Sequence, residues 1–208
     1  MRSHVLTGFV SLASVLGLLL APAPAHARKS FAPIPPDQTG GKVSGLELRI
    51  VRYDGATNGV FEVEVKNTRA EPADFSARGL YFVPDGNAND APQRLGAVGP
   101  FNVKTEKGWQ RKEKMSLAPG GVARMRLDVY CIDSHRASPG PSTGFHVARG
   151  RLPKKVADDI LEGAGMAAQG LGGISSPHAK SAVQSEVWKN RDKEWVKLDG
   201  DGAQEAGK

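Results

Sequence analysis

Cys131 is the only cysteine in the 208 residues, and its side chain is the strongest intrinsic nucleophile of the chain. It ends an alternating run, 122–132, in which Met125, Leu127 and Val129 share its face. A lone cysteine on an apolar face is typical of a buried small hydrophobe, so we expect Cys131 to be structural. The alternative is a nucleophile joined to a glutamine side chain as a thioester. With one cysteine, an intramolecular disulfide framework and a multi-cysteine metal site are both excluded.

A second chemical interpretation groups Cys131 with Asp133 and His135, as in a cysteine hydrolase. Along an extended strand, Cys131 and His135 are separated by about 13 Å, at roughly 3.3 Å per residue. A nucleophile and its base must lie within hydrogen-bonding distance, so the hydrolase is the weakest of these hypotheses. We expect Asp133 and Arg136 to tie the strand end to the loop at 139–141 instead.

A basic segment with an embedded tryptophan lies near the middle of the chain. It consists of Lys104, Lys107, Trp109, Arg111, Lys112 and Lys114, diluted by Glu106 and Glu113. Such a segment is typical of a solvated hairpin. Its functional interpretation is contact with a polyanion, such as an acidic surface polysaccharide or lipopolysaccharide.

The sequence has no residue pattern for a metal, a cofactor or acid–base catalysis. The histidines beyond the N-terminal segment, His135, His146 and His178, are scattered without ligand spacing. The glycine-rich stretch 163–173 follows no expected strand, so it fits a helix terminus better than a phosphate loop. We therefore expect no catalytic, cofactor-binding or metal residue.

The N-terminus has the pattern of a bacterial secretory signal peptide. A positive end at Arg2 precedes the uncharged apolar run 5–20, and the small residues Ala25 and Ala27 suit a signal peptidase. We expect residues 1–27 to be removed and the remainder to be secreted or periplasmic. The alternative is a membrane anchor, although the run is shorter than the roughly 20 residues of a typical span. We expect no later transmembrane segment, and export disfavours a nucleic-acid partner.

Period-two alternation predicts an antiparallel β-sandwich over residues 43–144. Apolar residues alternate with charged ones at 46–50 and again at 61–66, which is typical of half-buried strands. A long late strand is expected at 122–132, after turns rich in glycine and proline. The preceding residues 28–42 have the composition of a linker, so we expect them to be extended and flexible.

Residues 145–198 are expected to form about two helices that pack on the sandwich as a C-terminal cap. Their apolar stripes comprise Val156, Ile160, Ala164 and Ala167, and then Ala179, Ala182, Val183 and Val187. The Ser-Pro pair at 176–177 suits the cap and first position of the second helix. Trp188 and Trp195 are expected to cover the sheet. The last residues, 199–208, are small or charged and are expected to be disordered.

Part of the strand region resembles bacterial immunoglobulin-like accessory domains. The matching features are the valine-rich strand at 60–65, Asn67 directly after it, and the turn LAPGG at 117–121 before a late strand. The resemblance implies a fold and no function. The expected fold class is therefore mainly β: an immunoglobulin-like antiparallel β-sandwich with a C-terminal helical cap.

A narrower pair of motifs is similar to those of bacterial thioester adhesin domains. The run YCID at 130–133 matches their aromatic–cysteine motif, and VQSEVW at 183–188 matches their downstream helix motif. This resemblance implies a surface adhesin that couples covalently to an amine, with Cys131 and Gln184 as the candidate residues.

Together these observations predict an exported, non-enzymatic binding or envelope-associated structural module, without cofactor. Its expected partner is a protein or an acidic polysaccharide of the cell envelope. The thioester-forming adhesin is kept as the alternative. The two hypotheses differ in the chemistry that they require of Cys131.

Overall fold

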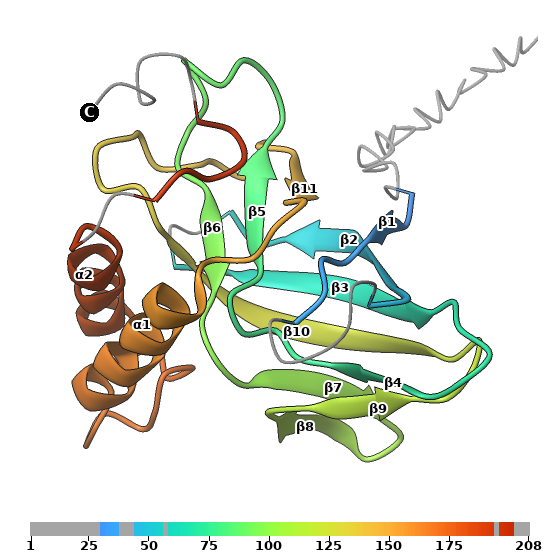
Figure 1. Cartoon of the computed structure of the whole chain (residues 1–208). Coiled ribbons are helices and arrows are strands. Elements are labelled where there is room, and N and C mark those ends of the chain that lie inside the picture. The colour runs from blue at the N-terminus through green and yellow to red at the C-terminus, as the bar shows by residue number, and fades with distance from the viewer. Residues whose placement is uncertain (1–29, 38–43, 56–57, 194–195, 202–208) are drawn as a thin grey trace, which may run out of the picture.

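The protein is described here by a computed structural model that covers residues 30–37, 44–55, 58–193 and 196–201. Its elements are mostly antiparallel β-strands, followed by two α-helices (Figure 1). The strands are β1 (Ala32–Pro33), β2 (Leu46–Tyr53), β3 (Val60–Asn67), β4 (Ala73–Phe75), β5 (Tyr81–Pro84), β6 (Leu95–Ala97), β7 (Phe101–Thr105), β8 (Gly108–Lys112), β9 (Met115–Leu117), β10 (Val122–Cys131) and β11 (Phe145–Val147). The predicted class, mainly β with helices, is confirmed.

Strand β10 organises the main sheet, whose order is β1-β2-β3-β10-β6-β5-β11. One edge of β10 pairs with β3 over residues 122–128. The other edge is divided, because β7 pairs at Met125 and Arg126 whereas β6 pairs over residues 129–131. The β7–β8 hairpin is therefore attached to the first part of β10 only.

The main sheet curls until β11 approaches β1 and β2, which makes it nearly closed and barrel-like. Phe61 lies in its core and packs edge-on against Phe82 and Phe145, with ring centroids 4.6 and 5.3 Å away. Such edge-to-face packing is a favoured arrangement of aromatic rings. The small β4–β9 sheet adds Phe75 and Leu117 to the same core.

Successive residues of β10 face opposite sides of the sheet, as the alternation predicts. The side that carries Cys131 belongs to the core inside the sheet. On the outer side, Arg124 and Arg126 are exposed, whereas Tyr130 is fully buried. The outer side of this one strand is therefore open to solvent at its beginning and covered at its end.

Helices α1 (Lys154–Ala167) and α2 (Lys180–Arg191) provide that cover (Figure 1). Their buried residues form a second core together with Tyr130 of β10 and Ile132 directly after it; the helix members are Val156, Ala157, Ile160, Ala164, Val183 and Val187. The helices approach each other closely at Gly163. A Cβ atom there would lie 2.4 Å from Nδ2 of Asn190, so the packing requires a glycine.

The second helix begins later than the sequence indicates. Residues 176–177 lie in a turn, which the Ala179 amide closes by donating to the Ser176 carbonyl at 3.0 Å. Helix α2 then starts at Lys180 without a side-chain cap. The Ser-Pro pair thus makes the turn that precedes the helix and is not its first turn.

Both ends of the described chain pack against the sheet, in segments for which we expected a flexible linker and a disordered tail. In the first, β1 pairs with β2, and Ile34 is buried and donates its amide to the Leu46 carbonyl at 2.9 Å. At the other end, Asp201 of the expected tail is bonded to Arg94, and the Asp199 amide donates to the Tyr81 hydroxyl at 2.9 Å. A buried apolar residue thus holds the first segment and polar contacts hold the second, and neither has a local pattern in the sequence.

Some expectations lie outside the described residues, namely the signal peptide at 1–27 and the contact of Trp195. Trp188 is half-buried and donates its Nε1 hydrogen to Oε1 of Gln93 at 3.0 Å. Within the described part of the chain, no helix is long and apolar enough to cross a membrane.

Candidate functional site

The environment of Cys131 keeps its thiol protonated. The residue is fully buried inside the sheet. Burial, and to a smaller extent the negative charge of Asp133, raises the pKa of the Cys131 thiol to about 12. The thiolate is the nucleophilic form of cysteine, so this side chain is a weak nucleophile at neutral pH.

Gln184, the other candidate residue for covalent adhesion, lies directly beside Cys131. The Cys131 amide donates to Oε1 of Gln184 at 3.0 Å, and Nε2 of Gln184 donates to the Cys131 carbonyl at 2.8 Å. Both hydrogen bonds are buried and involve the backbone of Cys131. They satisfy two polar backbone groups at the end of β10 and fasten α2 to the sheet.

The residues of the hydrolase hypothesis are in different environments. His135 is exposed and Cys131 is buried, which argues against a nucleophile–base pair. The carboxylate of Asp133 is bonded to Arg94. Our expectation that Asp133 ties the strand end to the loop at 139–141 is therefore wrong. The residue that pairs with Asp133 is Arg94, which directly precedes β6.

Arg94 is the centre of a buried ion network that sequence reasoning missed. Its Nε and Nη2 donate to the two carboxylate oxygens of Asp133 at 2.8 and 2.6 Å, and both side chains are 1% exposed. Its Nη1 donates to Oδ1 of Asp201 at 2.6 Å. The three residues are far apart in the chain, and no local pattern links them. A bidentate ion pair of this kind is a strong geometric constraint. Together with the bond to Asp201, it joins the ends of β6 and β10 to the C-terminal segment.

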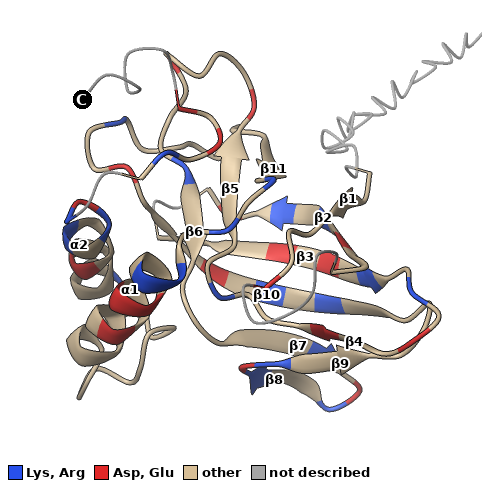
Figure 2. Ribbon diagram, in the orientation of Figure 1, with Lys and Arg blue, Asp and Glu red and all other residues tan. Residues whose placement is uncertain are grey.

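Most charged side chains of the main sheet lie on its open outer side. Figure 2 shows basic residues on β2 and β10 and acidic residues on β3 between them. Cross-strand register explains the pattern, because Arg49 lies opposite Glu64 and Glu62 lies opposite Arg126. We call this surface the charged sheet face. Its cations are Arg49, Arg52, Lys66, Lys104, Arg111, Arg124 and Arg126, and its carboxylates are Glu47, Glu62, Glu64 and Asp128.

The charged sheet face has more cations than carboxylates, and its ion pairs involve only some of the cations. Arg49 pairs with Glu64 at 2.5 Å, and Nε of Arg124 pairs with Oε1 of Glu62 at 2.6 Å. Among the described residues, no carboxylate pairs with Arg52, Lys104 or Arg126. Both carboxylates of β3 are thus engaged, and the remaining cations are available to an external anion.

Two of these cations lie over the ring of Trp109. The Cζ atom of Arg126 is 4.1 Å from the centroid of that ring, and Nζ of Lys104 is 5.6 Å away. Both distances are within the range of cation–π attraction. Trp109 is half-buried, whereas Lys104 and Arg126 are exposed. The ring therefore holds two charged side chains in place on the surface.

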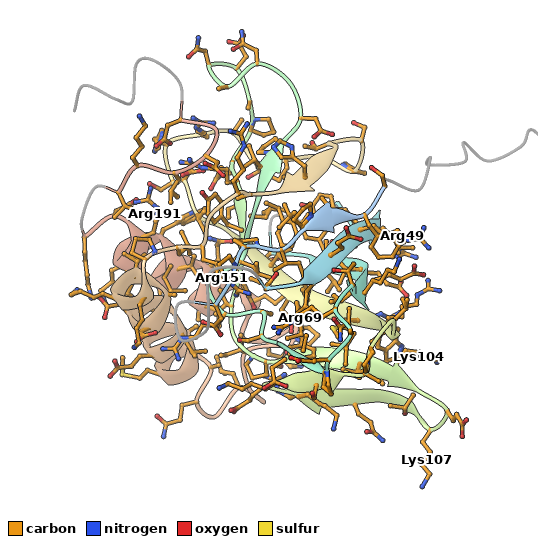
Figure 3. The ribbon with its side chains drawn as sticks, turned by 45° about the vertical axis from the view of Figure 1, so that its right-hand side comes forward. Arg49, Arg69, Lys104, Lys107, Arg151 and Arg191 are labelled. Atoms are coloured by element: carbon orange, nitrogen blue, oxygen red, sulfur yellow. The ribbon has the colours of Figure 1, made fainter. Side chains whose placement is uncertain are left out.

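The structure divides the basic segment that we singled out as a polyanion contact. Lys104, Trp109 and Arg111 lie on the charged sheet face, and Lys107 projects from the hairpin tip (Figure 3). Lys112 lies on the opposite side of the hairpin, because it is paired with Phe101, whose side chain enters the core. Lys114 lies beyond the hairpin and lines a separate cleft. Strand alternation alone separates the neighbours 111 and 112.

A chain of polar contacts marks the boundary between the charged sheet face and the helical cover. Nη1 of Arg111 donates to Oγ of Ser175 at 2.5 Å, and the Ser175 hydroxyl donates in turn to the carboxylate of Asp128. One residue earlier, the Ile174 carbonyl accepts the Tyr130 hydroxyl at 2.8 Å. The loop between α1 and α2 is thus fixed on β10 where the exposed arginines end.

The structure adds no metal centre to this account. In the described ranges, no group of histidine, cysteine and carboxylate side chains is arranged to hold a metal ion.

Comparisons with protein-family models, with curated proteins and with solved structures find no match to the chain. The immunoglobulin-like and adhesin-like interpretations therefore stay predictions.

Proposed function

We propose that this chain is an exported, non-enzymatic module of a bacterial cell envelope that binds an acidic polysaccharide through its charged sheet face. The observation that carries the proposal is the cluster of Lys104, Arg126 and Trp109, in which two cations without an acidic partner among the described residues lie over an aromatic ring. The export pattern at 1–27 supports the compartment.

Repeated carboxylates on a flexible polymer suit this face better than a single small anion does. The cations that lack a carboxylate partner among the described residues, such as Arg52 and Lys104, come from several strands of the sheet. A regular polyanion engages several of them at once, and the attraction is screened as salt is added. We therefore expect an affinity that falls steeply with ionic strength.

The proposal is non-enzymatic because the strongest nucleophile of the chain is in the wrong state for catalysis. The Cys131 thiol is buried and its pKa is raised to about 12. Activated cysteines have the opposite environment, which is exposed and electropositive and lowers the pKa.

Titration of the full mature chain with polygalacturonate tests the proposal, with calorimetry at low and at physiological salt. The double variant Lys104→Gln/Arg126→Gln should bind at least about tenfold more weakly, since two charge-assisted contacts are lost. The matched control, Lys155→Gln/Lys193→Gln, removes the same charge from α1 and from the turn after α2, and it should bind as the unaltered chain does. Equal losses in both variants, or no binding by the unaltered chain, would contradict the proposal.

Within this proposal, the barrel-like sheet is an immunoglobulin-like scaffold. Support comes from two of its motif features, which touch each other in the structure. Nδ2 of Asn67 donates to the carbonyls of Leu117 and Ala118 at 3.0 and 3.1 Å, and the side chain is fully buried. Asn67 thus fastens the LAPGG turn to the end of β3. An experimental structure with strands in two facing sheets would establish this type of fold, and a continuous closed barrel would exclude it.

The thioester adhesin is the second candidate, and the contact between Gln184 and Cys131 is the observation in its favour. In that chemistry the Cys131 sulfur attacks the side-chain amide carbon of a glutamine, the C–N bond breaks and ammonia leaves. The intact mass would then be lower than that of the sequence by one ammonia, and methylamine would open the bond with a mass gain. An unmodified mass, unchanged by methylamine, rejects this candidate.

A further inference from the structure

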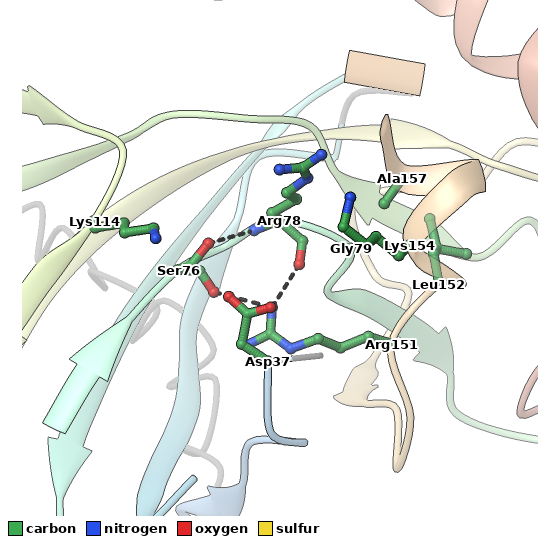
Figure 4. Close-up of a pocket in the computed structure, with 9 residues that line it drawn as sticks. All are labelled: Asp37, Ser76, Arg78, Gly79, Lys114, Arg151, Leu152, Lys154 and Ala157. Carbon is green, nitrogen blue, oxygen red and sulfur yellow. Dashed lines mark hydrogen bonds between the residues drawn. The ribbon is translucent and has the colours of Figure 1, made fainter. Parts of the chain in front are cut away.

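A second basic site lies away from the charged sheet face, in a cleft beside the beginning of α1 (Figure 4). Its lining comes from the connection between β4 and β5, from the approach to β9 and from the segment around 151–157. The charged residues that line it are Asp37, Arg78, Lys114, Arg151 and Lys154. None of them belongs to the charged sheet face, and Lys114 is the one that our sequence analysis had grouped with the hairpin.

Arg151 is the least usual of these residues. Its guanidinium donates to three backbone carbonyls, those of Pro35 at 3.1 Å, Ser76 at 3.1 Å and Arg78 at 2.5 Å. Carbonyl oxygens hold the group in position but do not neutralise it. In the described part of the chain, it makes no ion pair with a carboxylate, and burial lowers its pKa even though the charge of Asp37 opposes that effect. The cleft thus contains a fixed positive charge that is poorly hydrated.

Three further cations line the same space. Arg78 and Lys154 share one carboxylate, that of Asp158, so the pair of them keeps an excess of positive charge. Lys114 is exposed and, within the described residues, has no acidic partner. With Asp37 and Asp158 included, the cleft and its rim still carry more positive than negative charge.

The first turn of α1 adds to the positive electrostatic potential of the cleft. Lys154 and Ala157 of that turn line the cleft. The helix has no side-chain cap and no acidic residue in its first turn. The amide hydrogens and the positive end of the helix dipole are therefore not compensated by the protein itself.

We propose that this cleft binds a single oxyanion group, a phosphate or a carboxylate, with Arg151, Lys114 and Lys154 as its principal contacts. The cleft, which is open to solvent, offers about 70 Å³ to water-sized groups. That space is sufficient for one oxyanion. This inference does not depend on the proposed function of the charged sheet face.

The test is a titration of the ¹⁵N-labelled mature chain with inorganic phosphate at constant ionic strength, followed by amide chemical shifts. A parallel titration with glucuronate distinguishes a phosphate-bearing from a carboxylate-bearing source. We expect saturable shifts at the amides of Arg78, Gly79 and Lys154. Saturation with either anion supports the site, and saturation with neither overturns it.

A matched pair of variants separates specific binding from general charge. Lys154→Met and Lys155→Met change neighbouring residues of one helix, each with an ion-pair partner four residues on, at 2.6 and 2.9 Å. Only Lys154 lines the cleft. Phosphate should bind about fivefold to tenfold more weakly to Lys154→Met and to Lys114→Met, as expected for one lost charged contact, and normally to Lys155→Met. Equal weakening in Lys154→Met and Lys155→Met would contradict the proposal.

Discussion

The two halves of β10 have the same alternating pattern but opposite environments on their outer side. In the first half, Arg124 and Arg126 face solvent and join the charged sheet face. In the second half, Tyr130 lies under the helices in the second core, together with Ile132 directly after the strand. The contact of Ser175 with Asp128 marks the change.

This difference shows that the strand pattern alone does not decide which surface is available for binding. Alternation places residues on a face, and the connection after the strand decides whether that face is covered. The covered half depends on long-range polar contacts for its stability. In the open half, Met125 belongs to the core, but the exposed side chains on the outer side should contribute little to stability. Substitutions at the covered end should therefore lower the free energy of unfolding, whereas substitutions on the open outer side should lower polyanion binding.

The largest effect is expected at the covered end, from Asp133→Asn. The substitution leaves the buried Arg94 guanidinium without its two-pronged partner, and removing one member of a buried ion pair costs about 3–5 kcal/mol of folding free energy. Urea denaturation followed by circular dichroism measures this loss. As a control, Glu106→Gln removes an exposed carboxylate at the hairpin tip and should leave the midpoint unchanged. A small effect of Asp133→Asn would show that the network does not hold the covered half together.

A smaller loss is expected when the fastening of α2 to β10 is removed. Gln184→Ala leaves the amide and carbonyl of Cys131 unsatisfied in a buried place, which costs about 1–3 kcal/mol per group. The same denaturation assay, with the exposed Gln110→Ala as control, measures it. Hydrogen exchange should also become faster at the end of β10. Unchanged exchange there would contradict the fastening role.

The buried thiol should add a pH-dependent contribution of its own. Cys131→Ala should cost on the order of 1 kcal/mol at neutral pH, and Cys131→Ser more, because a hydroxyl is then buried. The pKa of the Cys131 thiol rises from about 9 to about 12 on folding. Its contribution is therefore complete below pH 9 and is lost as the pH rises towards 12, because only the unfolded chain releases the proton in that window.

The stability difference between the unaltered chain and Cys131→Ala measures that contribution directly, since other groups titrate in both. It should fall above pH 9 by up to about 1.4 kcal/mol per pH unit, so a difference of about 1 kcal/mol changes sign before pH 11. A thiol reagent should label Cys131 slowly in the folded chain and completely after denaturation. Rapid labelling of the folded chain would mean an accessible thiol and would contradict the structural role.

The smallest effect on stability is expected in the open half. Arg126→Gln removes an exposed cation that has no acidic partner among the described residues, so the free energy of unfolding should change by less than about 0.5 kcal/mol. The same variant should nevertheless weaken polygalacturonate binding. Denaturation and calorimetry on one sample test both statements. A large loss of stability would mean that Arg126 is structural and that the comparison of the two halves fails.

Local periodicity was sufficient to predict the long elements. The alternation at 61–66 became β3, the run at 122–132 became β10, and the side of β10 that carries Cys131 was correctly expected to be apolar. The strands of two or three residues, such as β4 and β6, are too short to have a recognisable period.

The candidate sites were predictable only in part, because their residues come together through the fold. The paired motif resemblance singled out Cys131 and Gln184, and the structure places the Gln184 side chain on the backbone of Cys131, which does not test the thioester. The buried position of Arg94 and the cleft around Arg151 have no local signature, since their partners are distant in sequence. The basic segment was recognised, but its division over two faces and a cleft needed the strand boundaries.

The most direct test of the central claim is an amide chemical-shift map of the mature chain during titration with polygalacturonate. The account predicts saturable shifts in β7, in β8 and in residues 122–126 of β10, diminishing as salt is added. The end of β10 around Tyr130 should not shift, because helices cover it. A titration that leaves β7, β8 and residues 122–126 unshifted would contradict the assignment of the charged sheet face as the binding surface.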